Sequence, residues 1–383
     1  MTDSTPRVLI LMSDTGGGHR SAAEAIAAAF AREFPDRYQV TLVDAIARAA
    51  VFPFNHAADW YLPFTTYAEF LWRFLFHLTN HRVTARALLF CIDLLMGRGI
   101  RRVLREQSPD LVVTAHPILN AIPQRALRAL GSPAPFVVVV TDLFSAHAVW
   151  FNPDADLTLV PTDGARQVGA QWKISPEKMR VVGLPVSLQF LGNSKSRADH
   201  RAELGLAPDR AAVLLVGGGE GMGPLFEIAR AIDRARLPLQ LVVVAGRNRK
   251  LYDKLRAAVW QTPVSIQGFV TNMPDWMRAS DVIVTKAGPG TISEALACGL
   301  PILLSGFLPG QEEGNVTFVQ ESGVGVLRDK PEEIARTLGE WLTPGNDTLA
   351  RFGARARQLA RPRAALEIAD ILNEILTAQK SDV

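Results

Sequence analysis

Short apolar runs rich in Val, Leu and Ile alternate along the chain with longer segments that read as helices. The runs predict strands at 7–13, 38–44, 111–115, 136–141, 157–161 and 181–183, and again at 212–216, 240–245, 264–269, 281–285 and 301–305. Strands that alternate with helices predict parallel sheets with crossover helices. The pattern therefore predicts an α/β fold.

The second half of the chain restarts the rhythm of the first, because each half opens with a strand, a glycine turn and a helix. We therefore expect two doubly wound domains, residues 1–187 and residues 188–345. The polar stretch 187–209 is the expected linker region, and 349–380 is predicted to be helical within a last segment, residues 346–383.

Residues 51–76 break this pattern with ten of the chain's 29 aromatic residues and only two carboxylates. The ten are Phe52, Phe54, Trp60, Tyr61, Phe64, Tyr67, Phe70, Trp72, Phe74 and Phe76. The arginines 82, 86, 98, 101, 102 and 105 follow. An aromatic helical insert beside arginines suits the headgroup zone of an anionic membrane, whereas packing on the sheet is the alternative.

Composition narrows the class of protein. Of 383 residues, 48% are hydrophobic and 21% charged, which excludes a disordered or fibrous chain. A net charge of +3 is too small for a charge-driven nucleic-acid binder. Cys91 and Cys298 cannot form a disulfide framework or a Cys-rich zinc site, and we expect both to be buried.

No stretch approaches the ~20 apolar residues that span a bilayer, and the apolar run Val8–Met12 is too short for a secretory signal. These features predict a soluble or membrane-peripheral intracellular protein.

The first candidate site is the string Ser13–Arg20, which joins the first strand to the first helix and contains three glycines. Glycines at a helix N-terminus leave space for an anionic or hydroxyl-bearing ligand. His19 is expected in the first helical turn, where the helix dipole disfavours its protonation and keeps it available as a base. A purely structural histidine is the alternative.

Two further glycine turns follow strands in the second half. Residues 217–223 read Gly217, Gly218, Gly219, Glu220, Gly221, Met222 and Gly223, and residues 288–291 read Gly288, Pro289, Gly290 and Thr291. Backbone N–H groups in such turns bind a diphosphate without a metal. Glu294 follows one turn into the helix, where it can bind a ribose diol or merely suit the dipole.

A polar loop, residues 309–315, follows the strand predicted at 301–305 on the same carboxyl edge. Ligands bind at that edge in open α/β sheets, and Gln311, Glu312 and Asn315 suit a sugar with several hydroxyls. Asp154 and Asp156 match a metal-binding D-x-D pattern, but they lie far from the phosphate loops and we interpret the match as a coincidence. We expect no metal.

Four strings together resemble the monogalactosyldiacylglycerol synthases, relatives of bacterial processive diacylglycerol glucosyltransferases. They are DTGGGHR (14–20), GGGEGMGP (217–224), KAGPGTI (286–292) and PGQE-x-GN (309–315), and the resemblance covers about residues 7–340. It implies a GT-B fold, with two Rossmann-like domains facing a central cleft. It also implies a first domain for diacylglycerol, a second for the UDP-sugar, and a C-terminal helix that packs back on the first domain.

The family implies a role for each matching position. Gly217–Gly223 and Gly288–Thr291 would hold the diphosphate, Glu294 the ribose, Gln311 and Glu312 the sugar, and Val270 would lie at the uracil. His19 and Asp14 would lie at the acceptor hydroxyl. The acceptor and membrane positions would include Gly17, Gly18, Trp60, Tyr61, Phe64, Trp72, His116 and Trp150. Ala148 departs from the His-Pro of plant members, which puts the lipid-site geometry in doubt.

The implied reaction is an inverting displacement that yields a β-glycoside of diacylglycerol. His19, aided by Asp14 or Asp142, would take or orient the hydroxyl proton, and backbone N–H groups rather than a metal or cofactor would stabilise the departing UDP. The third and fourth strings resemble those of the galactose-using plant enzymes, which favours galactose over glucose.

A UDP-sugar 2-epimerase and a non-catalytic UDP-sugar sensor are the remaining alternatives. The absence of a transit peptide favours a bacterial member, bound to the inner face of the cell membrane. Processivity and oligomeric state are left open.

Overall fold

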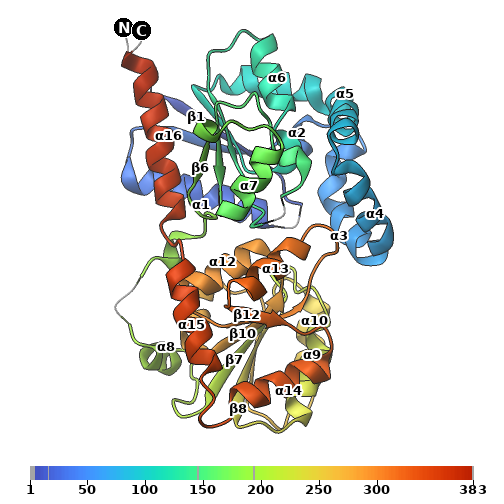
Figure 1. Cartoon of the computed structure of the whole chain (residues 1–383), viewed down its shortest axis with the longest axis vertical. Helices are drawn as coiled ribbons and strands as arrows, with labels where there is room; N and C mark the ends of the chain where they lie inside the picture. The colour runs from blue at the N-terminus through green and yellow to red at the C-terminus, as the bar shows by residue number, and fades with distance from the viewer. Residues whose placement is uncertain (1–4, 16, 145, 193–194, 382–383) are drawn as a thin grey trace. The chain divides into compact units, whose positions relative to one another are not determined.

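The chain divides into two compact units. The computed structural model describes residues 5–15, 17–144, 146–192 and 195–381, so Gly16 of the first glycine string and Asn193 and Ser194 of the predicted linker lie outside the described residues. One unit is Met1–Leu188 with Pro309–Gln311 and Pro362–Val383, and the other is Gln189–Leu308 with Glu312–Arg361. Each contains one six-stranded parallel sheet (Figure 1), which confirms the predicted α/β class.

The first unit is built on a sheet of strand order β2-β1-β3-β4-β5-β6. Its strands are β1 (Arg7–Met12), β2 (Gln39–Asp44), β3 (Leu111–Thr114), β4 (Phe136–Val139), β5 (Leu157–Val160) and β6 (Met179–Val181). Its α-helices are α1 (Gly18–Glu33), α2 (Ala45–Ala49), α3 (Ala57–Tyr67), α4 (Glu69–Thr79), α5 (Arg82–Gln107), α6 (Ile122–Ala129), α7 (Asp163–Gln171) and α16 (Ala364–Ser381). Short 3-10 turns occur at Phe54–His56, Pro117–Leu119, Ala148–Trp150, Pro176–Lys178 and Leu188–Phe190.

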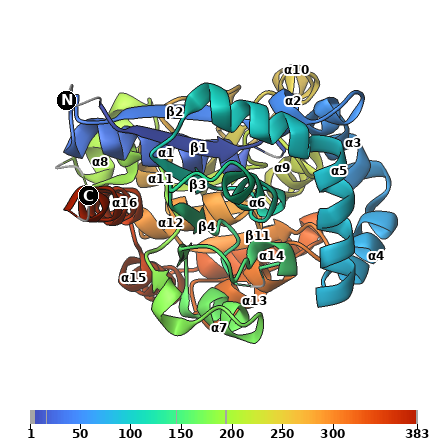
Figure 2. The same cartoon turned by 90° about the horizontal axis from the view of Figure 1, so that it is seen from above.

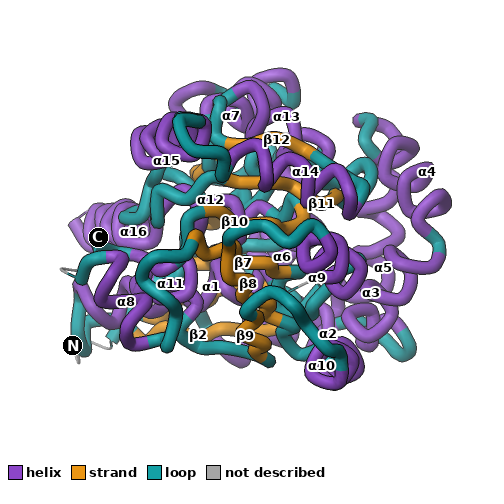
Figure 3. The backbone as a smooth tube through the Cα atoms, turned by 90° about the horizontal axis from the view of Figure 1, so that it is seen from below, coloured by secondary structure: helices purple, strands orange, loops and turns teal. Residues whose placement is uncertain are grey.

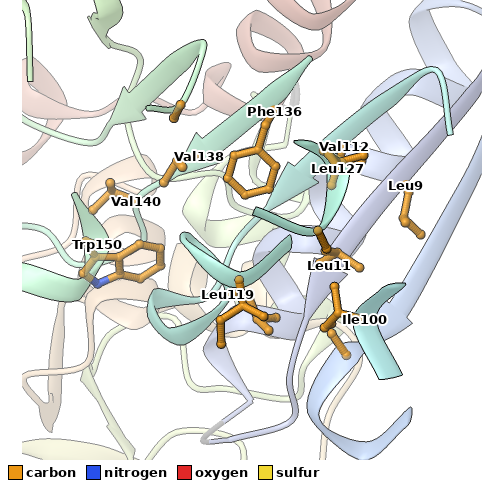
Figure 4. Close-up of a cluster of buried hydrophobic side chains, with 14 of the residues drawn as sticks. Leu9, Leu11, Ile100, Val112, Leu119, Leu127, Phe136, Val138, Val140 and Trp150 are labelled. Atoms are coloured by element: carbon orange, nitrogen blue, oxygen red, sulfur yellow. The ribbon is translucent and has the colours of Figure 1, made fainter. Parts of the chain in front are cut away.

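The core of this unit follows from the two-residue period of its strands. Leu9 and Leu11 of β1 face the same side as Val112, Phe136 and Val138, and these residues join one buried cluster (Figure 4). Helix α5 adds the side chain of Ile100 to that cluster. On another part of the unit, α16 packs along α1 (Figure 2). Beside them, Tyr38 Oη donates to Asn373 Oδ1 at 2.5 Å.

The second unit has the strand order β12-β11-β10-β7-β8-β9. Its strands are β7 (Ala211–Val216), β8 (Leu239–Val244), β9 (Val264–Gln267), β10 (Val282–Lys286), β11 (Ile302–Gly306) and β12 (Gly325–Leu327). Its helices are α8 (Arg197–Glu203), α9 (Leu225–Arg234), α10 (Arg249–Ala257), α11 (Met273–Ala279), α12 (Pro289–Ala297), α13 (Glu313–Glu321), α14 (Pro331–Trp341) and α15 (Thr348–Leu359). Helices α9 and α14 pack against each other beside the sheet (Figure 3).

Strand order determines where a ligand binds in each unit. In the first sheet the chain winds from β1 to β2 and then crosses to β3 on the other side of β1. In the second it winds from β7 through β8 to β9 and then crosses to β10 on the other side of β7. The loops after β1 and β3, and those after β7 and β10, therefore diverge at the carboxyl edge and leave a crevice there.

Three details differ from the sequence prediction. The helix expected over 349–380 is two helices, α15 and α16, since Pro362 between them lacks the N–H that a continuous helix requires. The short edge strand β12 was not predicted. Cys91 is exposed on α5, so the expectation that it is buried is wrong.

Among the described residues, none of the helices combines the length and the apolar character that crossing a membrane requires.

Candidate active site

The crevice of the first sheet brings two predicted histidines together. His19 is the second residue of α1, and His116 follows β3. Their ring centroids are 4.5 Å apart in an edge-to-face arrangement. Thr15 Oγ1 lies 2.8 Å from His116 Nε2, and Thr141 Oγ1 lies 3.0 Å from His19 Nδ1. The loops after β1, β3 and β4 thus build one polar cluster.

The side chains packed around the half-buried His19 ring desolvate it and keep it uncharged at neutral pH. Desolvation lowers the pKa of His19 to about 4, against a smaller opposing effect of a hydrogen bond to the Ala115 carbonyl. Because that carbonyl only accepts, one ring nitrogen carries the proton, and the other is unprotonated at neutral pH. Burial, and then the neighbouring His19, also hold the pKa of His116 well below its ordinary value.

The N-terminus of α1 is open in front of these rings. Gly17 caps the helix in the left-handed conformation, with φ of 73° and no side-chain cap. A Cβ at Gly17 or Gly18 would meet no heavy atom within 4 Å. The first N–H groups of α1 therefore lack a side-chain cap, and an uncapped helix N-terminus suits an anionic or hydroxyl-bearing ligand.

The two predicted aspartates have different surroundings. Asp142 is buried, and its Oδ2 accepts from Trp150 Nε1 at 2.6 Å. The Trp150 ring lies 6.0 Å from the His19 ring, so Asp142 orients an indole that packs beside the histidine. Asp14 is exposed and pairs with Arg20, whose Nη2 donates to Asp14 Oδ2 at 2.6 Å.

Helix α4 docks on the loop that carries Trp150. Val149 N donates to His147 Nδ1 at 3.2 Å, so the proton lies on Nε2, which is 3.2 Å from the Phe76 carbonyl oxygen. Ala148 N donates to Asn80 Oδ1 at 2.8 Å. Ala148, the departure from the family pattern, is thus held through its backbone N–H.

The aromatic insert has an inner and an outer face. On the inner side Trp72 of α4 contacts the rings of Tyr61 and Phe64 of α3 at centroid distances of 5.6 and 6.2 Å. Trp60 is exposed. Three of the four predicted acceptor or membrane aromatics of the insert therefore form a cluster that joins the two helices.

Loop Pro309–Gln311 groups with this unit and lies against the same helices. Tyr61 Oη donates to Gln311 Oε1 at 3.0 Å. A Cβ at Gly310 would lie 2.9 Å from Phe76 Cδ1. Gln311, predicted to hold a sugar, is thus held by a tyrosine of the insert.

On the outer face, Phe70 and Phe74 belong to the aromatic insert predicted to meet a membrane, whereas the other apolar residues there were not predicted. Phe70, Leu71, Phe74, Leu75 and Leu78 of α4 are all exposed, as are Val83, Phe90 and Leu94 of α5. Spacings of three, four, seven and eight residues place side chains on one helix face, and this spacing is the signal that could have found them. We call these eight residues the apolar face.

In the second unit the glycine loop after β7 folds back on itself. Met222 N donates to the Gly217 carbonyl at 2.8 Å, and a Cβ at Gly217 would lie 2.2 Å from Met222 O. A Cβ at Gly221, where φ is +61°, would lie 2.1 Å from Ala245 O. These two glycines are therefore required by packing of the loop itself, whereas at Gly218 and Gly223 a Cβ would meet no atom closer than 3.9 Å.

The next loop opens α12 beside this turn. Gly288 is the N-cap, Pro289 the first helical residue, and the first turn has no acidic residue and no side-chain cap. Asn315 Nδ2 donates to the Ala287 carbonyl at 2.9 Å, so Asn315 orders the start of α12. Burial raises the pKa of Glu294, in the second turn, to about 7.

Lys286 and Glu312 form an ion pair at this edge. Lys286 Nζ lies 2.5 Å from Glu312 Oε1, and Glu312 Oε2 accepts from Leu308 N at 2.8 Å. Glu312 is buried, so both charges lie in a region of weak solvent screening. Lys286 was not predicted, although it opens the string KAGPGTI.

The remaining predicted positions are placed as follows. Glu220 pairs with Arg247, whose guanidinium lies over the exposed Phe269 ring at 4.2 Å, next to partly buried Val270. Gly219 borders Arg247, Thr291 is partly exposed, and a Cβ at Gly290 would meet no atom within 4 Å.

The D-x-D residues are engaged in the fold. Asp156 Oδ2 accepts from Phe136 N at 2.7 Å, and Asp154 Oδ2 lies 3.4 Å from Arg128 Nη1. Within the described ranges, no three or more His, Cys, Asp or Glu side chains gather in a way that could hold a metal ion.

Two family models match the chain. The model described as Monogalactosyldiacylglycerol (MGDG) synthase matches residues 19–186, and Glycosyltransferase family 28 C-terminal domain matches residues 212–345. Monogalactosyldiacylglycerol synthase, chloroplastic, of Spinacia oleracea is 39% identical over 98% of this chain and 73% of its own length. The synthase 2 of Arabidopsis thaliana is 39% identical over 97% of this chain and 81% of its own. These relatives are chloroplast proteins of plants and give no support to the predicted bacterial source.

Solved structures share the fold at low sequence identity. MurG of Acinetobacter baumannii has a TM-score of 0.61 at 16% identity, covering 96% of this chain and 99% of its own. MnaA of S. aureus, solved with UDP, has a TM-score of 0.63 at 13% identity, covering 97% of each chain. These likenesses confirm the predicted GT-B fold, with its two Rossmann-like domains.

Proposed function

The chain belongs to the monogalactosyldiacylglycerol synthase family, and from this premise we propose that it transfers a hexose, in the first place galactose, from a UDP-sugar to diacylglycerol. The observation that carries the proposal is 39% identity over 98% of the chain to an enzyme named for this product. The bound UDP in a neighbour of the same fold supports a UDP-linked donor.

In the proposed reaction, the diacylglycerol hydroxyl attacks the anomeric carbon from the face opposite UDP and inverts it. His19 is the proposed general base, because its ring is uncharged at neutral pH and no side chain crowds Gly17 and Gly18 beside it. Asp142 would act through Trp150 as a positioning residue. The N–H groups of the glycine loop and of the start of α12 would bind the departing diphosphate.

A radiolabel transfer assay tests this proposal. Purified protein is mixed with diacylglycerol in anionic vesicles and with UDP-galactose or UDP-glucose, with and without EDTA. We expect a labelled β-glycolipid, more with galactose, and undiminished in EDTA, because backbone amides and a helix N-terminus supply the leaving-group donors. Faster transfer from UDP-glucose would make the protein a glucosyltransferase, and turnover of the nucleotide sugar without lipid would make it an epimerase. UDP binding without either reaction would support the sensor alternative.

We also propose that the apolar face meets the membrane. Phe70 is 86% exposed and Phe74 54% exposed, and exposed arginines, Arg86 and Arg98, lie along α5. Aromatic rings that enter the headgroup zone beside cations suit an anionic membrane surface. An anionic membrane surface is therefore the proposed location of the protein.

Replacing Phe70 and Phe74 together by Ser is expected to weaken binding to vesicles with anionic lipid by about 100-fold, roughly tenfold for each ring removed from the bilayer. Sedimentation with vesicles measures the partition. Val259→Ser, which removes an apolar side chain 85% exposed in the second unit, is the matched control and should leave binding unchanged. Equal partition of the double variant and the wild type would refute the assignment.

A further inference from the structure

One cation lies between the two loops that are proposed to hold the diphosphate. A Cβ at Gly288 would lie 3.2 Å from Lys286 Nζ, and a Cβ at Gly218 would lie 3.9 Å from Lys286 Cε. Gly218 follows β7 and Gly288 follows β10, the two strands that flank the crevice of the second sheet. The lysine side chain therefore lies close to both glycine loops.

The backbone places this side chain through an irregularity in the sheet. Thr285 pairs with Leu304, but Lys286 pairs with Gly306, so β11 contributes one extra residue at this step. Such a bulge turns the end of a strand and redirects the side chain there. Lys286 is the last residue of β10, and its carbonyl accepts from Gly288 N at 2.8 Å.

The ammonium group has donors to spare. In the part of the chain that the structure describes, its one hydrogen-bond partner is Glu312, and its side chain is 27% exposed. An ammonium has three N–H bonds, so two can reach a ligand. Glu312 bonds the ammonium through Oε1 alone, because its Oε2 accepts from Leu308 N.

We propose that Lys286 binds the β-phosphate of the UDP-sugar and stabilises the leaving diphosphate, while its bond to Glu312 orients that carboxylate toward the sugar. The inference rests on the proposed function, and it names a residue that would bind the UDP-sugar donor. Glu312 is the predicted ligand of the sugar, so a cation bonded to it lies at the sugar end of the diphosphate. When the bond from the anomeric carbon to the phosphate oxygen breaks, the electron pair stays on that oxygen, and the Lys286 ammonium balances the new charge.

Titration calorimetry with UDP and with UMP, which lacks the β-phosphate, tests the assignment. Lys286→Met is expected to weaken UDP binding by about 10- to 100-fold, the loss typical of a charged hydrogen bond, and to change UMP binding less than about threefold. Lys286→Arg keeps the charge and should retain most of the UDP affinity. Lys330→Met removes an exposed lysine that pairs only with Glu333 in the described structure, 3.5 Å away, and is the matched control.

A double variant distinguishes two explanations for a loss of UDP affinity in Lys286→Met. Either Lys286 contacts the phosphate directly, or it acts only by neutralising the charge of Glu312. If Lys286 contacts the β-phosphate, Lys286→Met combined with Glu312→Gln stays weak for UDP. Recovery of wild-type UDP affinity in the double variant, equal loss of UMP and UDP affinity in Lys286→Met, or no loss of UDP affinity would each overturn the assignment. Wild-type protein that binds UDP but makes no glycolipid would instead count against the transferase proposal and leave this test in place.

Discussion

His19→Ala is expected to lower kcat/KM for hexose transfer by roughly 10²- to 10⁴-fold, the usual contribution of a positioned general base. The ring lies 3.0 Å from Thr141 Oγ1 and is packed by His116 and Trp150, so its orientation is restricted. His19→Asn keeps a side chain that can bond Thr141 but has no basic nitrogen, and should lose as much. Steady-state assays with diacylglycerol vesicles measure both variants, and a kcat/KM within threefold of wild type would eliminate the base role.

The pH profile gives an independent readout for the same residue. Protonation removes the lone pair, so activity is lost as the pH falls through the pKa of His19. Because burial lowers that pKa to about 4, kcat/KM should stay flat from about pH 8 down to about pH 5.5, whereas an ordinary histidine would lose activity near pH 6.5. A midpoint near 6.5 would mean that the base is a different group or that the ring is hydrated.

Gly221→Ala is expected to weaken UDP binding by about 100-fold or more, because two or more backbone hydrogen bonds to charged phosphate are lost when the loop moves. The new Cβ would lie 2.1 Å from the Ala245 carbonyl oxygen, which belongs to the backbone and cannot turn away. The left-handed conformation and the clash together should cost about 2–5 kcal/mol of stability. Calorimetry with UDP and urea unfolding measure the two effects.

Gly205→Ala is the matched control for this change. Its φ is +69°, but a Cβ there would meet no heavy atom within 4 Å. The control therefore carries only the backbone cost of about 1–2 kcal/mol and should bind UDP like the wild type. If Gly221→Ala also bound UDP normally, the loop would not be the diphosphate site.

The sequence was informative about the sheets because buried parallel strands have a strong local signal. The predicted strands at 7–13 and 212–216 correspond to β1 and β7 within one residue at each end. The helix expected over 349–380 was divided wrongly, because its apolar periodicity continues across the break at Pro362. The glycine turns, and the place of His19 in the first turn of a helix, were predicted from spacing, since helix N-termini and tight turns have local requirements.

Contacts between distant segments were not predictable in this way. Asp142 was predicted as an aid to His19, but only the fold shows that its carboxylate binds the Trp150 indole. Lys286 appeared in the sequence only as the first residue of the string KAGPGTI. Its ion pair depends on a bulge against β11 and on Glu312, which lies 26 residues later. The number of aromatic residues in the insert does not show which of them are exposed. Only the structure separates Trp72, which packs against Tyr61, from Phe70, which is exposed on the apolar face.

The sequence by itself determined the α/β class, the two parallel sheets and the glycine turns that follow β1, β7 and β10. These features depend on residues near one another in the chain, where hydrophobic runs and backbone conformation act. Only the tertiary structure decided which side chains meet at each crevice, because strand order brings together loops that are about 100 residues apart, as for Thr15 and His116. It also decided the low pKa of His19, since desolvation depends on everything packed around the ring.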